Sequence, residues 1–153
     1  MHETEALHIR RLTAEDLEPL HRLLSDPAVM RYLEPPFTRA QMEAFLQKAG
    51  MGREPLIWAV EDGRGFAGYV IYHPYDETSM ELGWVLASDR WGRGYALALT
   101  RQMICRAREN GRDAVIECHP QQAATRHIAE KLGFRPCGMD GGCCVYRLAG
   151  KNE

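Results

Sequence analysis

The chain has 153 residues, of which 45% are hydrophobic and 26% are charged. This length and balance favour a single folded domain over residues 1–153 and exclude a chain that is disordered throughout. The net charge of −2 provides no overall positive field, so we expect no nucleic-acid partner.

The sequence shows neither the pattern of a membrane-spanning helix nor that of a secretion signal. No apolar run reaches the length of about 20 residues that a membrane-spanning helix needs, and the opening segment MHETEALHIRR is polar. We therefore expect a cytoplasmic protein that does not insert into a membrane. The five cysteines include no CxxC pair, which predicts free and mostly buried thiols. A zinc site from Cys137, Cys143, Cys144 and a histidine is the alternative, but we expect no metal.

The first 50 residues predict one strand followed by helices. LHIRRL (7–12) alternates between apolar and polar residues, as a strand does. Thr13 and Asp16 then form the pattern of a capping box at the start of a helix. Asp26 before Pro27 predicts a short second helix, and Thr38 opens a third helical segment that ends before the glycine at position 50.

Three β-rich segments follow: PLIWAVED (55–62), GFAGYVIYH (65–73) and MELGWVLAS (80–88). They are separated by turn sequences and lie so close together that an antiparallel meander is expected. After them we expect a long helix to about position 110, a strand at DAVIECH (113–119), a helix at QQAATRHIAEKLGF (121–134) and a last strand at GCCVYRL (142–148).

A strand, a helix and another strand in this order form a β-α-β crossover, whose two strands pair in parallel. The predicted fold class is therefore α+β: a mixed, mostly antiparallel sheet of six to seven strands, with a parallel crossover and helices on both faces.

The segment SDRWGRGYA (88–96) carries two glycines directly before the long helix. The first N–H groups of a helix have no partner inside it and attract anions, and glycines let an anion approach the backbone closely. Arg90 and Arg93 add cationic donors. A plain strand-to-helix turn with two solvated arginines is the alternative, and neither the Rossmann nor the Walker glycine pattern is present.

ELGWVLASDRWGRGYALAL (81–99), together with QQAATRHIAEKLGF and the opening segment 7–38, resembles the GCN5-related N-acetyltransferase (GNAT) superfamily. Within it the chain is most similar to the RimJ/RimL-like branch of ribosomal-protein N-terminal acetyltransferases. The resemblance implies the GNAT fold and a transferase that moves the acetyl group of acetyl-CoA to a primary amine: a protein N-terminus, an amino acid or another small amine. The expected state is a monomer or a homodimer. The alternative is a non-catalytic acyl-CoA sensor or interaction module with the same fold.

The resemblance also implies which residues hold acetyl-CoA. Val85 and Leu86 would pair with the pantetheine arm through their backbones, and Gln122 and Thr125 would lie near the same arm. The diphosphate would sit on the N–H groups of Arg93, Gly94, Tyr95 and Ala96, with Gly92 allowing the approach. Arg90 is included among the cofactor-binding residues as a charged donor near the same place. Two departures from the family pattern are Trp91, at the first position of the diphosphate motif, and Ala129, where many relatives have a tyrosine that reprotonates the CoA thiolate.

The chemistry of amine acetylation requires a neutral amine, so a base is useful. Glu81 is the candidate base, acting directly or through water; a solvent-facing strand residue is the alternative role. The backbone N–H of Val85 or Leu86 is the candidate donor to the oxyanion. Candidate acceptor-binding residues are Tyr32, Glu34, Phe37 and His119.

Overall fold

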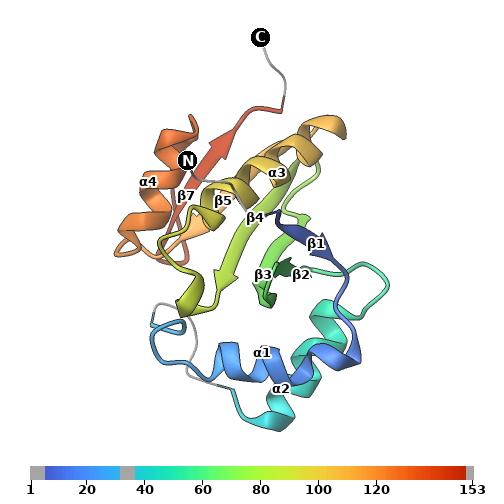
Figure 1. Cartoon of the computed structure of the whole chain (residues 1–153). Coiled ribbons are helices and arrows are strands. Elements are labelled where there is room, and N and C mark those ends of the chain that lie inside the picture. The colour runs from blue at the N-terminus through green and yellow to red at the C-terminus, as the bar shows by residue number, and fades with distance from the viewer. Residues whose placement is uncertain (1–5, 32–36, 151–153) are drawn as a thin grey trace. The chain divides into compact units, whose positions relative to one another are not determined.

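The computed structural model describes residues 6–31 and 37–150. The chain forms two compact units, each built from separate segments (Figure 1). Unit 1 contains the residues up to Ile71 together with Trp84–Tyr95, and unit 2 contains Tyr72–Gly83 together with the residues from Ala96 onward. The chain therefore crosses between the units inside two of its strands and at the start of its longest helix.

Unit 1 begins with strand β1 (His8–Arg10), a short 3-10 turn and helix α1 (Leu17–Leu24). The predicted capping box is confirmed, because the Thr13 N–H donates to Oδ2 of Asp16 over 2.8 Å. A second helix after Asp26 was expected and is wrong. Asp26 does cap the N–H of Ala28 (2.9 Å), but the chain makes only turns here.

The third helical segment is confirmed as α2 (Arg39–Phe45), which continues as a wider π-type turn through Gly50. Thr38 and Gln41 cap it reciprocally: each backbone N–H donates to the other's side chain. Leucines and methionines of α1 and α2, with residues from strands β2–β4, make the apolar core of unit 1. Apolar burial is the main force holding this unit together.

The strands of the described residues form one seven-stranded sheet in the order β1-β2-β3-β4-β5-β7-β6. Their bounds are β2 (Ile57–Asp62), β3 (Gly65–Pro74), β4 (Ser79–Leu86), β5 (Asp113–Cys118), β6 (Arg135–Asp140) and β7 (Cys143–Leu148). Strands β4 and β5 pair in parallel, whereas β5–β7 and β6–β7 pair antiparallel. The predicted mixed sheet with its parallel crossover is thus confirmed.

Strand β6 is missing from the sequence-based prediction. Its sequence RPCGMD contains a proline and a glycine, which are poor strand formers. A register shift between Pro136 and Gly138 and the position of β6 at the end of the sheet accommodate both residues.

Unit 2 carries most of helix α3 (Tyr95–Glu109) and all of α4 (Ala123–Lys131). Leu99, Met103 and Ala107 of α3 are buried at helical spacing. The helix ends before Gly111, whose φ of +69° is in the left-handed region.

The five cysteines are free thiols, as predicted, but the expectation that most are buried is wrong. Cys118 is buried, Cys143 and Cys144 are both half-buried, and Cys105 and Cys137 are exposed. Over residues 6–31 and 37–150 no three His, Cys, Asp or Glu side chains are grouped to hold a metal ion. In the same segments, no helix has the length and apolar character required to cross a membrane.

Candidate functional site

The glycine loop, residues Trp91–Gly94, connects a 3-10 turn at Ser88–Arg90 to the first residue of α3. Gly92 and Gly94 have φ angles of +76° and +80°, which side chains with a Cβ rarely adopt. A Cβ at either position would meet nothing within 4 Å. The glycines are therefore required by backbone conformation, and the space around them is open just before α3 begins. The first N–H groups of any helix have no partner inside the helix itself.

The two arginines beside this loop differ sharply in exposure. Arg93 is exposed within the loop. Arg90 is 8% exposed, and its Nε and Nη2 donate to the two oxygens of Asp62 over 2.9 and 3.1 Å. Its remaining Nη1 donates to Asp89. The prediction that Arg90 donates directly to a diphosphate is corrected: its guanidinium is occupied by carboxylates inside unit 1.

Asp62 lies at the end of β2, and its side chain is fully buried. Besides the fork of Arg90, it accepts the Tyr95 hydroxyl over 2.8 Å and the Arg64 N–H over 2.9 Å. The hydrogen bonds from Arg90 hold the pKa of Asp62 far below its usual range, against the opposing effect of burial. Asp62 is therefore an ionised carboxylate that contacts both the residue before the glycine loop and the residue after it.

The last residues of β4, Val85 and Leu86, are held from two sides within unit 1. The indole Nε1 of Trp91 donates to the Leu86 carbonyl over 3.0 Å. On the β3 side, a Cβ at Gly68 would lie 2.2 Å from the Val85 carbonyl oxygen, so only glycine allows this approach. The Leu86 carbonyl thus already accepts a hydrogen bond from within the chain.

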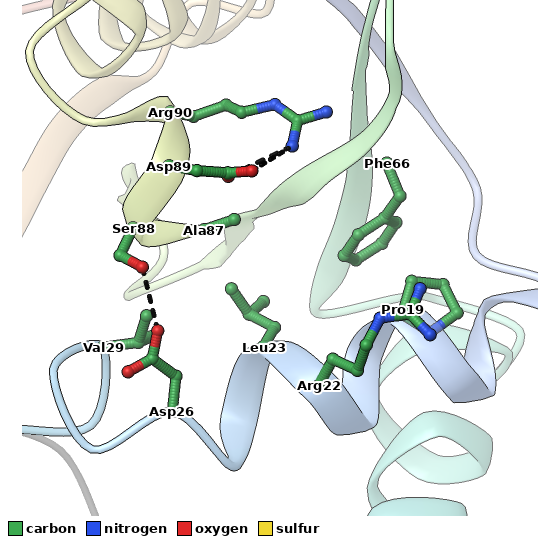
Figure 2. A pocket seen from close by; sticks show the side chains of 10 residues that line it. All are labelled: Pro19, Arg22, Leu23, Asp26, Val29, Phe66, Ala87, Ser88, Asp89 and Arg90. Carbon is green, nitrogen blue, oxygen red and sulfur yellow. Dashed lines mark hydrogen bonds and ion pairs between the residues drawn. The ribbon is translucent and has the colours of Figure 1, made fainter.

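A cavity of about 240 Å³ opens beside the 3-10 turn (Figure 2). Leu23 and Arg22 of α1, Phe66 of β3 and the turn itself line it. The Ser88 hydroxyl donates to Asp26 Oδ2 over 2.9 Å at its edge, so the turn is also fixed to the end of α1.

Unit 2 places Glu81 at the last pair of the parallel ladder. The ladder pairs Ser79–Glu81 with Asp113–Val115, and Glu81 lies opposite Val115. Because side chains alternate along a strand, Glu117 shares the face of Val115 and hence of Glu81. Oε1 of Glu81 lies 3.7 Å from Nε2 of His73. The Tyr75 hydroxyl hydrogen-bonds to Glu117. We call His73, Tyr75, Glu81 and Glu117 the Glu81 cluster.

The surroundings of Glu81 raise the pKa of its carboxyl group, which makes it a better proton acceptor than an ordinary carboxylate. Glu81 is 26% exposed, and burial raises its pKa above the ordinary carboxyl value. The charge of Glu117 raises the same pKa further, whereas His73 lowers it. Chiefly through its hydrogen bond to Glu117, the pKa of Tyr75 is raised to about 12. His73, Tyr75 and Glu117 were not among the residues predicted from the sequence. The available signal was Glu117, a charged residue directly after the apolar run AVI of the strand DAVIEC.

The remaining predicted residues of unit 2 lie around the start of α4. Gln122 precedes the helix, and its Oε1 accepts the His119 N–H over 2.9 Å. Nδ1 of His119 accepts the N–H of Gln121. Thr125 is half-buried on the helix. Gln122 and His119 thus have roles in the local turn.

The position without the family tyrosine, Ala129, is fully buried in α4. Strand β7 supplies the phenol of Tyr146, which accepts from Arg126 and donates to Glu130, both on α4. No hydroxyl is therefore supplied by position 129 itself.

The candidate acceptor residues Tyr32 and Glu34 lie outside the described residues. Phe37 is described: its ring packs edge-on against Phe45 with the centroids 5.6 Å apart. Phe45 in turn packs against Tyr69 of β3. Phe37 is thereby joined to the apolar core of unit 1.

Comparison with known proteins places this geometry in a family. The sequence model of the acetyltransferase (GNAT) domain matches residues 6–135. An uncharacterized N-acetyltransferase of Bacillus subtilis, YnaD, is 26% identical over 145 residues, covering 92% of this chain and 85% of the relative.

Solved structures share the fold. A GNAT-family acetyltransferase from Bacillus anthracis superposes with a TM-score of 0.80 at 24% identity, over 97% of both chains. Spermidine N-acetyltransferase from Vibrio cholerae, solved with CoA and spermine, gives a TM-score of 0.75 at 23% identity over 93% of both chains. With the family model matching most of its length, the chain belongs to the GNAT acetyltransferase family.

Proposed function

We propose that this chain is an acetyl-CoA-dependent N-acetyltransferase that acts on a cationic primary amine. Membership in the GNAT family supports the acetyl transfer. The observation that carries the proposal for this chain is the glycine loop: two glycines with positive φ, open space around both, and the start of a 15-residue helix directly behind them. This arrangement fits a diphosphate.

Acetyl-CoA supplies an activated thioester to this site. In our proposal the N–H groups of Arg93, Gly94, Tyr95 and Ala96 hold its diphosphate, and the exposed Arg93 side chain adds a cation. The N–H groups of Val85 and Leu86 pair with the pantetheine arm or donate to the oxyanion. Gln122 and Thr125 remain proposed contacts of the same arm.

Glu81 is the proposed base. An alkyl ammonium has a pKa near 10.4 and an α-ammonium one near 8, so either loses a proton before it attacks the thioester. A carboxylate with a raised pKa accepts that proton more readily than an ordinary one. A dedicated acid for the departing thiolate is not essential, because a thiol pKa near 8.5 makes the thiolate a tolerable leaving group. This is compatible with alanine at position 129.

The carboxylates of the Glu81 cluster also bear on the acceptor. Glu81 of β4 and Glu117 of β5, on one face of the sheet, favour a cationic substrate over an anionic one. The Vibrio cholerae relative is named for such a substrate, spermidine. A protein N-terminus, the acceptor implied by the RimJ/RimL-like resemblance, is the competing cationic amine.

A thiol-release assay tests the proposal. Acetyl-CoA is incubated with the protein and a panel of amines: polyamines, amino acids and short peptides with free N-termini. We expect amine-dependent release of free CoA thiol with at least one cationic class and none with anionic amines. Tight CoA binding without thiol release from any amine would instead identify a non-catalytic acyl-CoA-binding module, which the alanine at 129 favours.

A further inference from the structure

Asp62 stands out in unit 1 as a fully buried carboxylate that takes no part in the proposed chemistry. Its four described hydrogen-bond donors are Nε and Nη2 of Arg90, the hydroxyl of Tyr95 and the N–H of Arg64. Burying such a charge is costly unless every oxygen is satisfied. Here both oxygens accept at least two hydrogen bonds, so the charge is retained at this place by a dedicated set of partners.

The partners are arranged about the glycine loop. Arg90 is the residue directly before Trp91, and Tyr95 is the residue directly after Gly94. One carboxylate at the end of β2 therefore holds both ends of a four-residue segment. Two further contacts of this region, in contrast, each fix a single point: the Ser88 hydroxyl donates to Asp26, and the Trp91 indole donates to the Leu86 carbonyl.

A loop with two glycines needs such fixed ends. Glycine has more conformations available than any other residue, so the loop loses more entropy when it takes up one shape. If its ends were free, the binding of an anion would have to order the loop as well, and affinity would fall. A carboxylate with a bidentate arginine is a geometrically strict anchor.

We propose that Asp62 is a positioning residue: through Arg90 and Tyr95 it holds the glycine loop in the shape that receives the diphosphate of CoA. It does not touch the cofactor. This inference rests on the proposed function, since it presumes that the loop binds that diphosphate. It also gives Arg90 a role in place of the direct contact expected from the sequence.

Tyr95→Phe tests the inference, because it removes one hydroxyl and keeps the aromatic ring. Calorimetry compares the affinity of the variant for CoA and for pantetheine, which lacks the diphosphate. We expect CoA to bind about 2- to 10-fold more weakly, as for one lost hydrogen bond, and pantetheine to bind as it does to the unmodified chain. A merely structural defect would weaken both ligands alike.

Tyr72→Phe is the matched control. Tyr72 belongs to unit 2, and its hydroxyl interacts with Asn110, the residue after the last residue of α3. This variant should bind CoA unchanged. If Tyr95→Phe fails to fold, Arg90→Lys carries the same comparison, since it keeps a positive charge beside Asp62 but loses the fork.

The outcomes separate the two proposals. If the unmodified chain does not bind CoA, the proposed function fails. If it binds CoA but Tyr95→Phe binds it equally well, or loses CoA and pantetheine in the same proportion, the positioning role of Asp62 is overturned and the proposed function stands.

Discussion

The half-buried carboxylate of Glu81 offers the sharpest test of the chemistry. Glu81→Gln removes the proton acceptor and keeps the shape, so turnover should fall about 10- to 100-fold while CoA affinity is unchanged. Glu77→Gln, an exposed carboxylate in the turn before β4, should leave turnover unaltered. Steady-state rates from thiol release check both variants. Equal rates for Glu81→Gln and the unmodified chain would remove Glu81 from the mechanism.

The pH dependence follows from the same residue. A base works only when it is deprotonated, and the pKa of Glu81 is raised by burial. The rate of the unmodified chain should therefore fall as the pH is lowered through that raised pKa, at a higher pH than an ordinary carboxylate would give. In Glu81→Gln this limb of the pH profile should disappear.

A substitution at Gly94 tests whether the glycine loop binds the diphosphate of CoA. The φ of +80° at Gly94 is unfavourable for a β-branched residue, although the space around it is open. Gly94→Val should weaken CoA about 10-fold or more, because the loop must change shape and lose its close approach to the anion. Gly63→Ala, also in open space but without a positive φ, serves as the control for calorimetry. Unchanged CoA affinity in Gly94→Val would contradict the placement of the diphosphate.

Strands β3 and β4 lie very close together at Gly68. A Cβ there would lie 2.2 Å from the Val85 carbonyl oxygen and 2.9 Å from Leu86 Cα, both backbone atoms that cannot move cheaply. Gly68→Ala should therefore lower the free energy of unfolding by about 3 kcal/mol or more. Urea denaturation against Gly63→Ala measures this. A loss below about 1 kcal/mol would show that β4 can shift without consequence.

Several elements were predictable because local patterns determine them. The capping residues Thr13 and Thr38 and the β-rich segments of the meander gave correct element types. The failures have equally local causes. Asp26 and Pro27 carry the signal for a helix start, but the chain turns after one i to i+4 hydrogen bond, from Met30 to Asp26. Strand β6 contradicts its own propensities because pairing with β7 determines it.

For the whole molecule, several carboxylates have a lowered pKa in the folded state, among them Asp16, Asp62 and Asp113. Burial acts in the opposite sense in all three, and hydrogen bonds from arginines and backbone N–H groups prevail. Each group contributes stability that is fully present above its ordinary pKa near 4 and is lost as the pH falls below it. Stability should therefore decline steeply below about pH 4.

Asp62→Asn measures how much the Asp62 carboxylate contributes to the loss of stability at low pH. At neutral pH it should destabilise the fold by about 3–5 kcal/mol, because the buried Arg90 then keeps only the exposed Asp89 as a counter-charge. Below pH 4 the free energy of unfolding of the variant should fall less steeply with decreasing pH than that of the unmodified chain. The slope should differ by about 1.4 kcal/mol per pH unit, because unfolding of the variant no longer includes the uptake of one proton by Asp62. Urea titrations at several pH values check both effects. An unchanged slope would mean that Asp62 is not ionised in the folded state.

At this scale the order of the predicted segments and the family resemblance both predicted the fold class, and the glycine loop was visible in the sequence itself. It did not predict the partners of Arg90. A sequence displays an arginine beside two glycines but not the carboxylate 28 residues earlier that occupies its guanidinium. The Glu81 cluster was equally hidden, because His73, Glu81 and Glu117 come from three strands and become neighbours only through the register of the sheet.

Trp91 has one further consequence for this chain. Its indole is 51% exposed, yet its Nε1 is held by the Leu86 carbonyl, so the ring stands at a defined place in the glycine loop. Only two other tryptophans, Trp58 and Trp84, contribute background emission. A ligand that covers the loop should therefore alter the intrinsic fluorescence, and the molecule carries a built-in optical reporter of its own occupancy.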